Sequence, residues 1–181
     1  KKTSIEDIKT LVRWDTFNSS AGRLSTEIET ANWEFYSKYL SGAKKQRPAD
    51  ERALATVNGS VGEALGQLYV DAKFPPEAKA KAEIMIANVI DAYKARIQKL
   101  DWMGAETKEK AIEKLDKFTV KIAYPDKWED YSTMDVAADK TYFENMTAVG
   151  KWGQLKNFDE IGEPVDKSKW GMSPQTVNAY F

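Results

Sequence analysis

The clearest helical pattern in the sequence lies in residues 75–100, PPEAKAKAEIMIANVIDAYKARIQKL, where apolar side chains recur every three or four positions. The apolar positions are Ala82, Ile86, Val89, Tyr93, Ile97 and Leu100. This spacing places them on one face of an α-helix, which we expect to be buried. Pro75 and Pro76 interrupt the chain just before this face, so the helix is expected to begin there.

The same helical period covers most of the chain. It predicts further helices over about residues 4–18, 24–40, 51–72, 106–118 and 143–158. Ser4 and Asp7 have the spacing of an N-terminal helix cap. Gly42 can end the second helix in the left-handed conformation.

Two segments depart from this period. Val120, Ile122 and Tyr124 alternate like a short strand. The last eight residues, PQTVNAYF, contain β-branched and aromatic side chains and no charge, which suits an extended strand. The sequence therefore predicts a mainly α, multi-helix domain with a short extended C-terminal segment.

Three glycines lie at helical spacing within residues 51–72, at positions 59, 62 and 66. Each glycine in a helix is less favourable than alanine by up to about 1 kcal/mol, so the group suggests the close approach of a partner backbone. The pattern fits neither the phosphate-binding loop G-x-x-x-x-G-K-[ST] nor a dinucleotide-binding loop that follows a strand. Tight helix packing is therefore favoured over a ligand-binding role.

Composition excludes several classes of function. The net charge is −1, which gives no electrostatic reason to expect a nucleic-acid partner. No apolar run approaches the roughly 20 residues that span a bilayer, and no signal peptide is visible at Lys1–Ser4. The sequence has no Cys and no His, so a Ser-His-Asp triad, a Cys-His pair and an H-E-x-x-H zinc site are impossible within it.

For the other residues that could serve a chemical function, the sequence favours a structural role. The six tryptophans are scattered, so core or corner packing is favoured over a carbohydrate-binding platform, which is kept as a third hypothesis. The carboxylates Asp126, Glu129 and Asp130 lack the spacing of a calcium loop and are expected to form a solvated turn. Three glycosylation sequons, at positions 18, 58 and 145, are common by chance and say nothing about compartment.

The order of motifs is more specific than composition. The segments LSGAKKQRP, GEALGQLYVDAKFPPEAKAK, IQKLDWMGAETKEKAIEKL, YPDKWEDYS and PVDKSKWGMSPQTVNAYF follow one another from residue 40 to residue 181. In this order they resemble the neprilysin and endothelin-converting-enzyme family of zinc metallopeptidases. The resemblance covers essentially the whole chain and corresponds to the helical N-terminal region of that family.

The resemblance implies a domain division and a site. Residues 1–140 would form part of a helical domain that roofs a substrate cavity. Residues 141–181 would cross into the catalytic domain and end in an edge strand of the substrate cleft. Asn178 matches the family's asparagine whose side-chain amide bonds the bound peptide backbone, and Ala179 matches the neighbour that offers its backbone groups. The partners implied are a peptide substrate and a C-terminal catalytic domain that is missing from this sequence.

The resemblance also implies zinc in the intact parent protein, held by H-E-x-x-H and a distal Glu that lie outside this sequence. The chain alone is therefore expected to bind no zinc and to hydrolyse no peptide. The absence of Cys fits the bacterial branch of the family, and an extracytoplasmic location is favoured over a cytoplasmic one. The alternative is a stand-alone helical binding or scaffold module without peptidase activity. Continuation of the reading frame into H-E-x-x-H would favour the peptidase.

Overall fold

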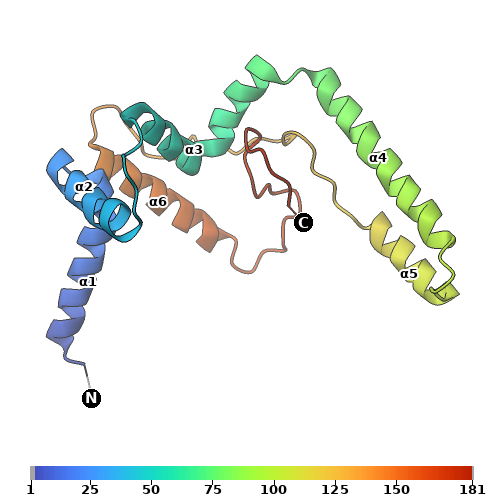
Figure 1. Ribbon diagram of the computed structural model, residues 1–181, viewed down its shortest axis with the longest axis horizontal. Helices are drawn as coiled ribbons and strands as arrows, with labels where there is room; N and C mark the ends of the chain where they lie inside the picture. Colours follow the sequence, from blue (N-terminus) through green and yellow to red (C-terminus); the bar gives the residue numbers. More distant parts are fainter. Residues whose placement is uncertain (1–2, 181) are drawn as a thin grey trace. The chain divides into compact units, whose positions relative to one another are not determined.

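The computed structural model describes residues 3–180 and is mainly helical (Figure 1). Within these residues 63% of the chain is helical, in six α-helices and two short helical elements, and there is no strand. The helices are α1 Ile5–Ser20, α2 Thr26–Trp33, α3 Ala49–Lys73, α4 Pro76–Gln98, α5 Ala105–Asp116 and α6 Tyr142–Asp159, with the short elements η1 Ala21–Arg23 and η2 Glu34–Leu40. The predicted fold class is confirmed, and each predicted helix is present.

Local side-chain signals set several helix ends. The Ser4 hydroxyl accepts a hydrogen bond from the Asp7 backbone N–H at 3.1 Å, and the Asp7 carboxylate accepts one from the Ser4 N–H. Thr141 and Glu144 make the same reciprocal pair at the start of α6. The hydrogen bond from the Thr141 hydroxyl holds the pKa of Glu144 below its ordinary value. Each pair satisfies N–H groups that have no partner inside the helix.

The chain forms two compact units, and each is built from two separate segments. The first unit contains residues 1–56 and 131–163. Its best-buried residue is Ala21 of η1, which is 3% exposed and lies where η1 meets α1, α2 and α6. The Trp152 indole of α6 donates to the Thr133 hydroxyl at 2.9 Å, and its ring lies 5.3 Å from that of Tyr131. These contacts attach the loop before α6 to the helix itself.

The second unit contains residues 57–130 and 164–181. Helices α4 and α5 form a hairpin (Figure 1), closed by an ion pair of 2.5 Å between Lys94 and Asp116. The chain then turns through Tyr124, whose ring stacks on that of Trp128 at 6.1 Å. The Lys79 ammonium of α4 lies 4.4 Å from the Tyr124 ring centre and donates to the Tyr124 carbonyl at 3.1 Å. A single cation of α4 therefore fixes this turn.

The predicted boundary at residue 140 concerns the domains of a longer peptidase. The two compact units describe contacts within this chain and do not test it. The division into a cavity-roof domain and a crossover into a catalytic domain therefore stays a prediction.

The predicted strand at residues 120–124 is wrong for the described part of the chain, because no other strand lies there to pair with it. The segment is irregular, and Ala123 adopts a left-handed backbone conformation with φ of 64°. Left-handed backbone is unfavourable for a residue that carries a Cβ, by roughly 1–2 kcal/mol. The alternating pattern indicated extended backbone but missed this strained position.

Replacing Ala123 with glycine is expected to stabilise the protein by about 0.5–1 kcal/mol. Glycine relieves the left-handed strain, and part of that gain is lost to the greater freedom of the unfolded chain. Urea-induced unfolding measures the change. Ala138→Gly, in a turn without positive φ, is the matched control and should be neutral or destabilising. A destabilising Ala123→Gly would mean that the left-handed conformation carries no strain.

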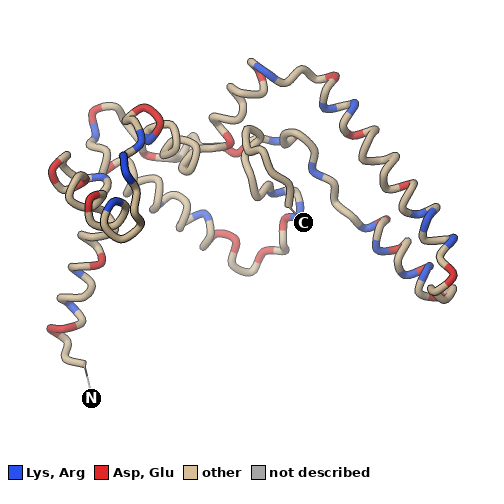
Figure 2. The backbone as a smooth tube through the Cα atoms, in the orientation of Figure 1, with Lys and Arg blue, Asp and Glu red and all other residues tan. Residues whose placement is uncertain are grey.

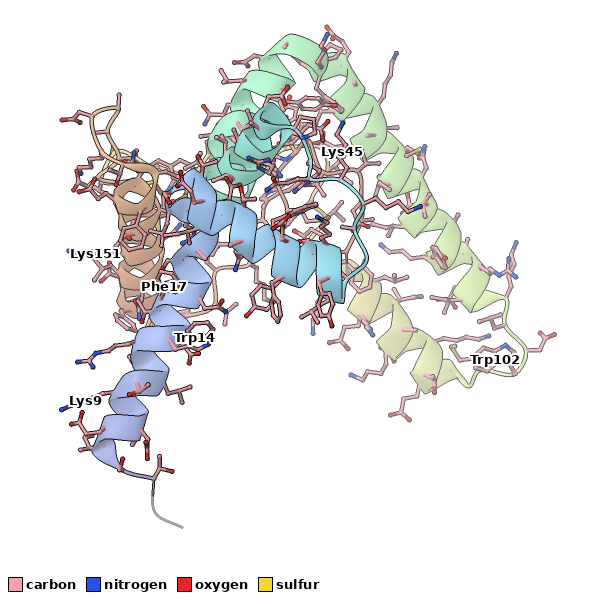
Figure 3. The ribbon with its side chains drawn as sticks, turned by 60° about the vertical axis from the view of Figure 1, so that its left-hand side comes forward. Lys9, Trp14, Phe17, Lys45, Trp102 and Lys151 are labelled. Carbon is pink, nitrogen blue, oxygen red and sulfur yellow. The ribbon has the colours of Figure 1, made fainter. Side chains whose placement is uncertain are left out.

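The apolar helix faces are more exposed than their periodicity predicts. Tyr93 of the predicted buried face of α4 is 58% exposed, and the only hydrophobic residues buried among residues 3–180 are Ala21, Val70 and Met134. The prediction that the tryptophans pack in the core or at corners is also wrong for two of them. Trp14 lies exposed on α1 beside Phe17, and Trp102 is 77% exposed at the corner between α4 and α5 (Figure 3). Periodicity reports that a helix is amphipathic, and it does not report whether a partner covers the apolar face.

Candidate functional site

The predicted site residues lie in a loop at the end of the chain, Trp170–Tyr180, which we call the C-terminal loop. Its turns are fixed by hydrogen bonds of 3.0 Å from the Thr176 N–H to the Ser173 carbonyl and from the Asn178 N–H to the Thr176 carbonyl. The Tyr180 hydroxyl accepts a third bond of 3.0 Å from the Gly171 N–H, which joins the two ends of the loop. No strand forms here among the described residues, and Phe181, the last residue of the VNAYF motif, lies outside them.

The side-chain amide of Asn178 has an acceptor, Oδ1, and a donor, Nδ2, and the loop uses only the acceptor. Its Oδ1 accepts a hydrogen bond of 2.8 Å from the Ala179 N–H. Its Nδ2 has no partner within residues 3–180, and the residue is exposed. The short bond to Ala179 orients the amide, so the unpaired N–H groups are presented as donors. The structure therefore combines a turn contact with a free donor in one side chain.

A groove of about 620 Å³ runs beside Asn178 and Ala179. It is lined by residues of the C-terminal loop and by residues of the 117–123 segment. Among the described residues, the lining contains the cations Lys117 and Lys121, the apolar side chains Phe118 and Ile122, and no carboxylate. The two predicted site residues thus border this groove.

Helix α3 receives the C-terminal loop at two of the three glycines singled out in the sequence. A Cβ at Gly66 would lie 2.6 Å from Pro174 Cδ, and a Cβ at Gly62 would lie 3.3 Å from the Ser173 side chain. The close approach predicted from the glycines is real, but the partner is this loop and not another helix. Gly59 has no such neighbour within 4 Å.

Gln175 completes this contact and was missed by the sequence reading. Its Nε2 donates to Asn58 Oδ1 at 2.5 Å and to the Gly62 carbonyl at 2.9 Å. The helix also departs from regular geometry here, since Val61 has φ of −134° and ψ of 42°. Helices commonly kink at glycine and serine, and Ser60 and Gly62 flank the irregular residue. The G-S-V-G stretch was the available signal for this kink.

The residues present do not fit a zinc ion. The sequence contains no His and no Cys, and within residues 3–180 no three carboxylates gather closely enough to hold a metal. The acidic turn is occupied otherwise. The Asp126 carboxylate accepts from Lys79 at 2.6 Å, and the Glu129 backbone N–H donates to Glu63 at 2.5 Å.

The sequon asparagines already serve the fold. Asn18 Oδ1 accepts from the Tyr36 hydroxyl at 3.2 Å, and Asn58 accepts from Gln175. Asn145 bonds both backbone groups of Ala137, at 2.9 Å each. A glycan would attach to the Asn145 Nδ2 that donates to the Ala137 carbonyl, whereas the contacts of Asn18 and Asn58 use only Oδ1.

Charge and hydropathy add no second site among residues 3–180. Lys and Arg are interspersed with Asp and Glu along α4 and α5 (Figure 2), as expected for a solvated helix face. No helix of the described residues has the combination of length and apolar character that a bilayer crossing requires.

Comparison with known proteins supplies the family. The sequence model of Peptidase family M13, for its N-terminal region, matches residues 1–125. This chain belongs to peptidase family M13. The resemblance to zinc metallopeptidases of the neprilysin type is confirmed by this match.

Individual relatives of this M13 chain agree with the assignment. Neprilysin-3 of Drosophila melanogaster is 33% identical over 175 residues, which cover 93% of this chain and 22% of the relative. Neutral endopeptidase of Lactococcus lactis is 33% identical over 147 residues, covering 81% and 23%. The structure of the Mycobacterium tuberculosis zinc metalloprotease Zmp1 in the open state superposes with a TM-score of 0.88 at 36% identity, covering 99% of this chain and 28% of Zmp1.

The M13 chain thus spans about a quarter of the length of these relatives. The Zmp1 match reaches across almost the whole chain, including the C-terminal loop that lies beyond the family-model match. Both α3 and that loop therefore lie in the part of the chain that aligns with a zinc metalloprotease.

Proposed function

We propose that this chain is the N-terminal helical segment of a zinc-dependent metalloendopeptidase, where it shapes the substrate cavity. Asn178 and Ala179 contact the backbone of the bound peptide. The observation that carries the proposal is the Asn178 amide, whose Oδ1 is engaged within the loop while its Nδ2 is unpaired at the edge of a groove. Family membership supplies the reaction class.

The geometry of Asn178 gives it a specific task. With Oδ1 bonded to the Ala179 N–H, the side chain acts as a donor toward a peptide carbonyl. The same bond occupies the Ala179 N–H, so Ala179 offers its carbonyl to a peptide N–H. A donor and an acceptor on neighbouring residues match the alternating backbone groups of an extended peptide. The peptide would then lie in an extended conformation along the C-terminal loop.

The exposed apolar faces fit a chain that packs against more of a peptidase. Large side chains such as Trp14, Tyr93 and Trp102 are exposed in this chain, and the apolar face of an amphipathic helix is ordinarily covered by a partner. We propose that these faces help to enclose the cavity. The zinc ligands and the catalytic groups belong to other parts of that protein, so this chain by itself neither binds zinc nor hydrolyses peptides. The enzyme is proposed to work outside the cytoplasm.

In the complete peptidase, Asn178→Ala is expected to lower kcat/KM for peptide substrates, because a substrate backbone hydrogen bond is lost. The corresponding loss of transition-state stabilisation is about 1–2 kcal/mol. Asn178→Asp is the sharper variant. It keeps the oxygen that bonds the Ala179 N–H and removes the donor, so it should lower kcat/KM at least as much as Asn178→Ala. Steady-state kinetics with a fluorogenic peptide measures both variants.

Asn88→Ala is the matched control, since Asn88 is exposed on α4 and lies away from the groove. It should leave kcat/KM unchanged. If Asn178→Asp retains the original kcat/KM, Asn178 does not donate to the substrate and the proposed contact is ruled out.

A further inference from the structure

The contact between Gln175 and α3 places a polar anchor three residues before Asn178. We propose that Gln175 is a positioning residue, which ties the C-terminal loop to α3 and thereby sets the location of Asn178 in the substrate groove. This inference rests on the proposed function of Asn178 and goes beyond it, since Gln175 itself touches no substrate.

The anchor is built from both side-chain and backbone groups. Gln175 Nε2 donates to Asn58 Oδ1 and to the Gly62 carbonyl, and these two acceptors come from the irregular part of α3. Pro174 lies directly over Gly66, where a methyl group would not fit. The rigid proline ring and the two hydrogen bonds hold residues 174 and 175 in one place on the helix.

The position of the anchor is passed on to Asn178 through short turns. The Thr176 N–H bonds the Ser173 carbonyl, and the Asn178 N–H bonds the Thr176 carbonyl. Because each bond spans only two or three residues, the backbone between Gln175 and Asn178 has little freedom to adjust. A shift of Gln175 on α3 therefore moves the Asn178 amide by a comparable amount. Misplacement of a contact group by about 1 Å can lower a rate by up to about a hundredfold.

Stability alone gives a weaker account of Gln175. Its Oε1 is buried and has no hydrogen-bond partner within the described residues. A buried amide oxygen without a partner is unfavourable, so an apolar side chain of similar size would suit the contact with Gly66 at least as well. The two Nε2 bonds fix direction and distance, which is what a positioning role requires.

The first test measures the loop directly. Backbone amide exchange is followed in the complete peptidase for Gln175→Ala and for Gln175→Met, which keeps the side-chain length and removes the donor. Exchange at Thr176 and Asn178 should accelerate at least about tenfold in both variants. Gln98→Ala, at an exposed residue at the end of α4, should leave these rates unchanged. Unchanged exchange in Gln175→Met would overturn the anchor.

The second test links the anchor to the substrate contact. Gln175→Met should lower kcat/KM about tenfold, and adding Asn178→Ala should lower it less than about twofold further, because both changes remove one interaction. Independent, multiplicative losses would overturn the positioning role. If kcat/KM falls with Asn178→Ala but not with Gln175→Met, the positioning role is overturned and the proposed function stays intact. If kcat/KM falls with neither variant, both the positioning role and the proposed function are overturned.

Discussion

Gly66→Ala is expected to destabilise the protein by about 2–3 kcal/mol, the upper part of the range for overpacking a filled site. The added methyl group would lie 2.6 Å from Pro174 Cδ and 2.9 Å from Gln175 Oε1. Proline cannot rotate its ring away, and Gln175 is held by Asn58 and Gly62. The helix and the C-terminal loop must therefore separate to admit the methyl group.

Gly59→Ala is the matched control within the same helix. Apart from the chain neighbours and the backbone of the same helix, nothing lies within 4 Å of a Cβ there, so the change should follow helix propensity and stabilise the protein by up to about 1 kcal/mol. Urea-induced unfolding gives both free energies, and the opposite signs are the diagnostic result. If the two variants shift stability in the same direction and by similar amounts, the loop does not pack on Gly66 in solution.

Asn145→Ala is expected to destabilise the protein by about 2–3 kcal/mol, because several hydrogen bonds of a part-buried amide are lost together. Asn145 Oδ1 accepts from the Ala137 N–H, and its Nδ2 donates to the Ala137 carbonyl at 2.9 Å and to the Lys140 carbonyl at 3.4 Å. Removal of the amide leaves these backbone groups of the loop without that partner, next to the capped start of α6.

Asn157→Ala controls for the gain in helix propensity, since Asn157 is exposed near the end of the same helix. It should be neutral or slightly stabilising in the same urea titration. A loss below about 0.5 kcal/mol for Asn145→Ala, relative to this control, would mean that water replaces the amide and that the loop is not tied to α6.

The site was only partly predictable. The resemblance suggested Asn178 and Ala179 as candidate residues, because the VNAYF motif is a short run of consecutive residues; their contact with substrate stays a prediction. Gln175 carried no such signal, since the residue it bonds lies 117 positions earlier in the chain. The glycines did signal a close approach, but their pattern could not tell a loop from a helix as the partner, nor separate Gly59 from Gly66.

The sequence by itself determined the helices and their ends. The Ser4–Asp7 cap, the Pro75–Pro76 break and the glycine at position 42, with φ of 72°, act through bonds and dihedral angles within a few residues of one chain segment. Tertiary structure alone decided which apolar faces were covered, which glycines received the C-terminal loop and where the Asn178 amide lay. Those features depend on contacts between residues far apart in sequence. A local pattern specifies which face of a helix is apolar, and it does not specify which part of the protein packs against that face.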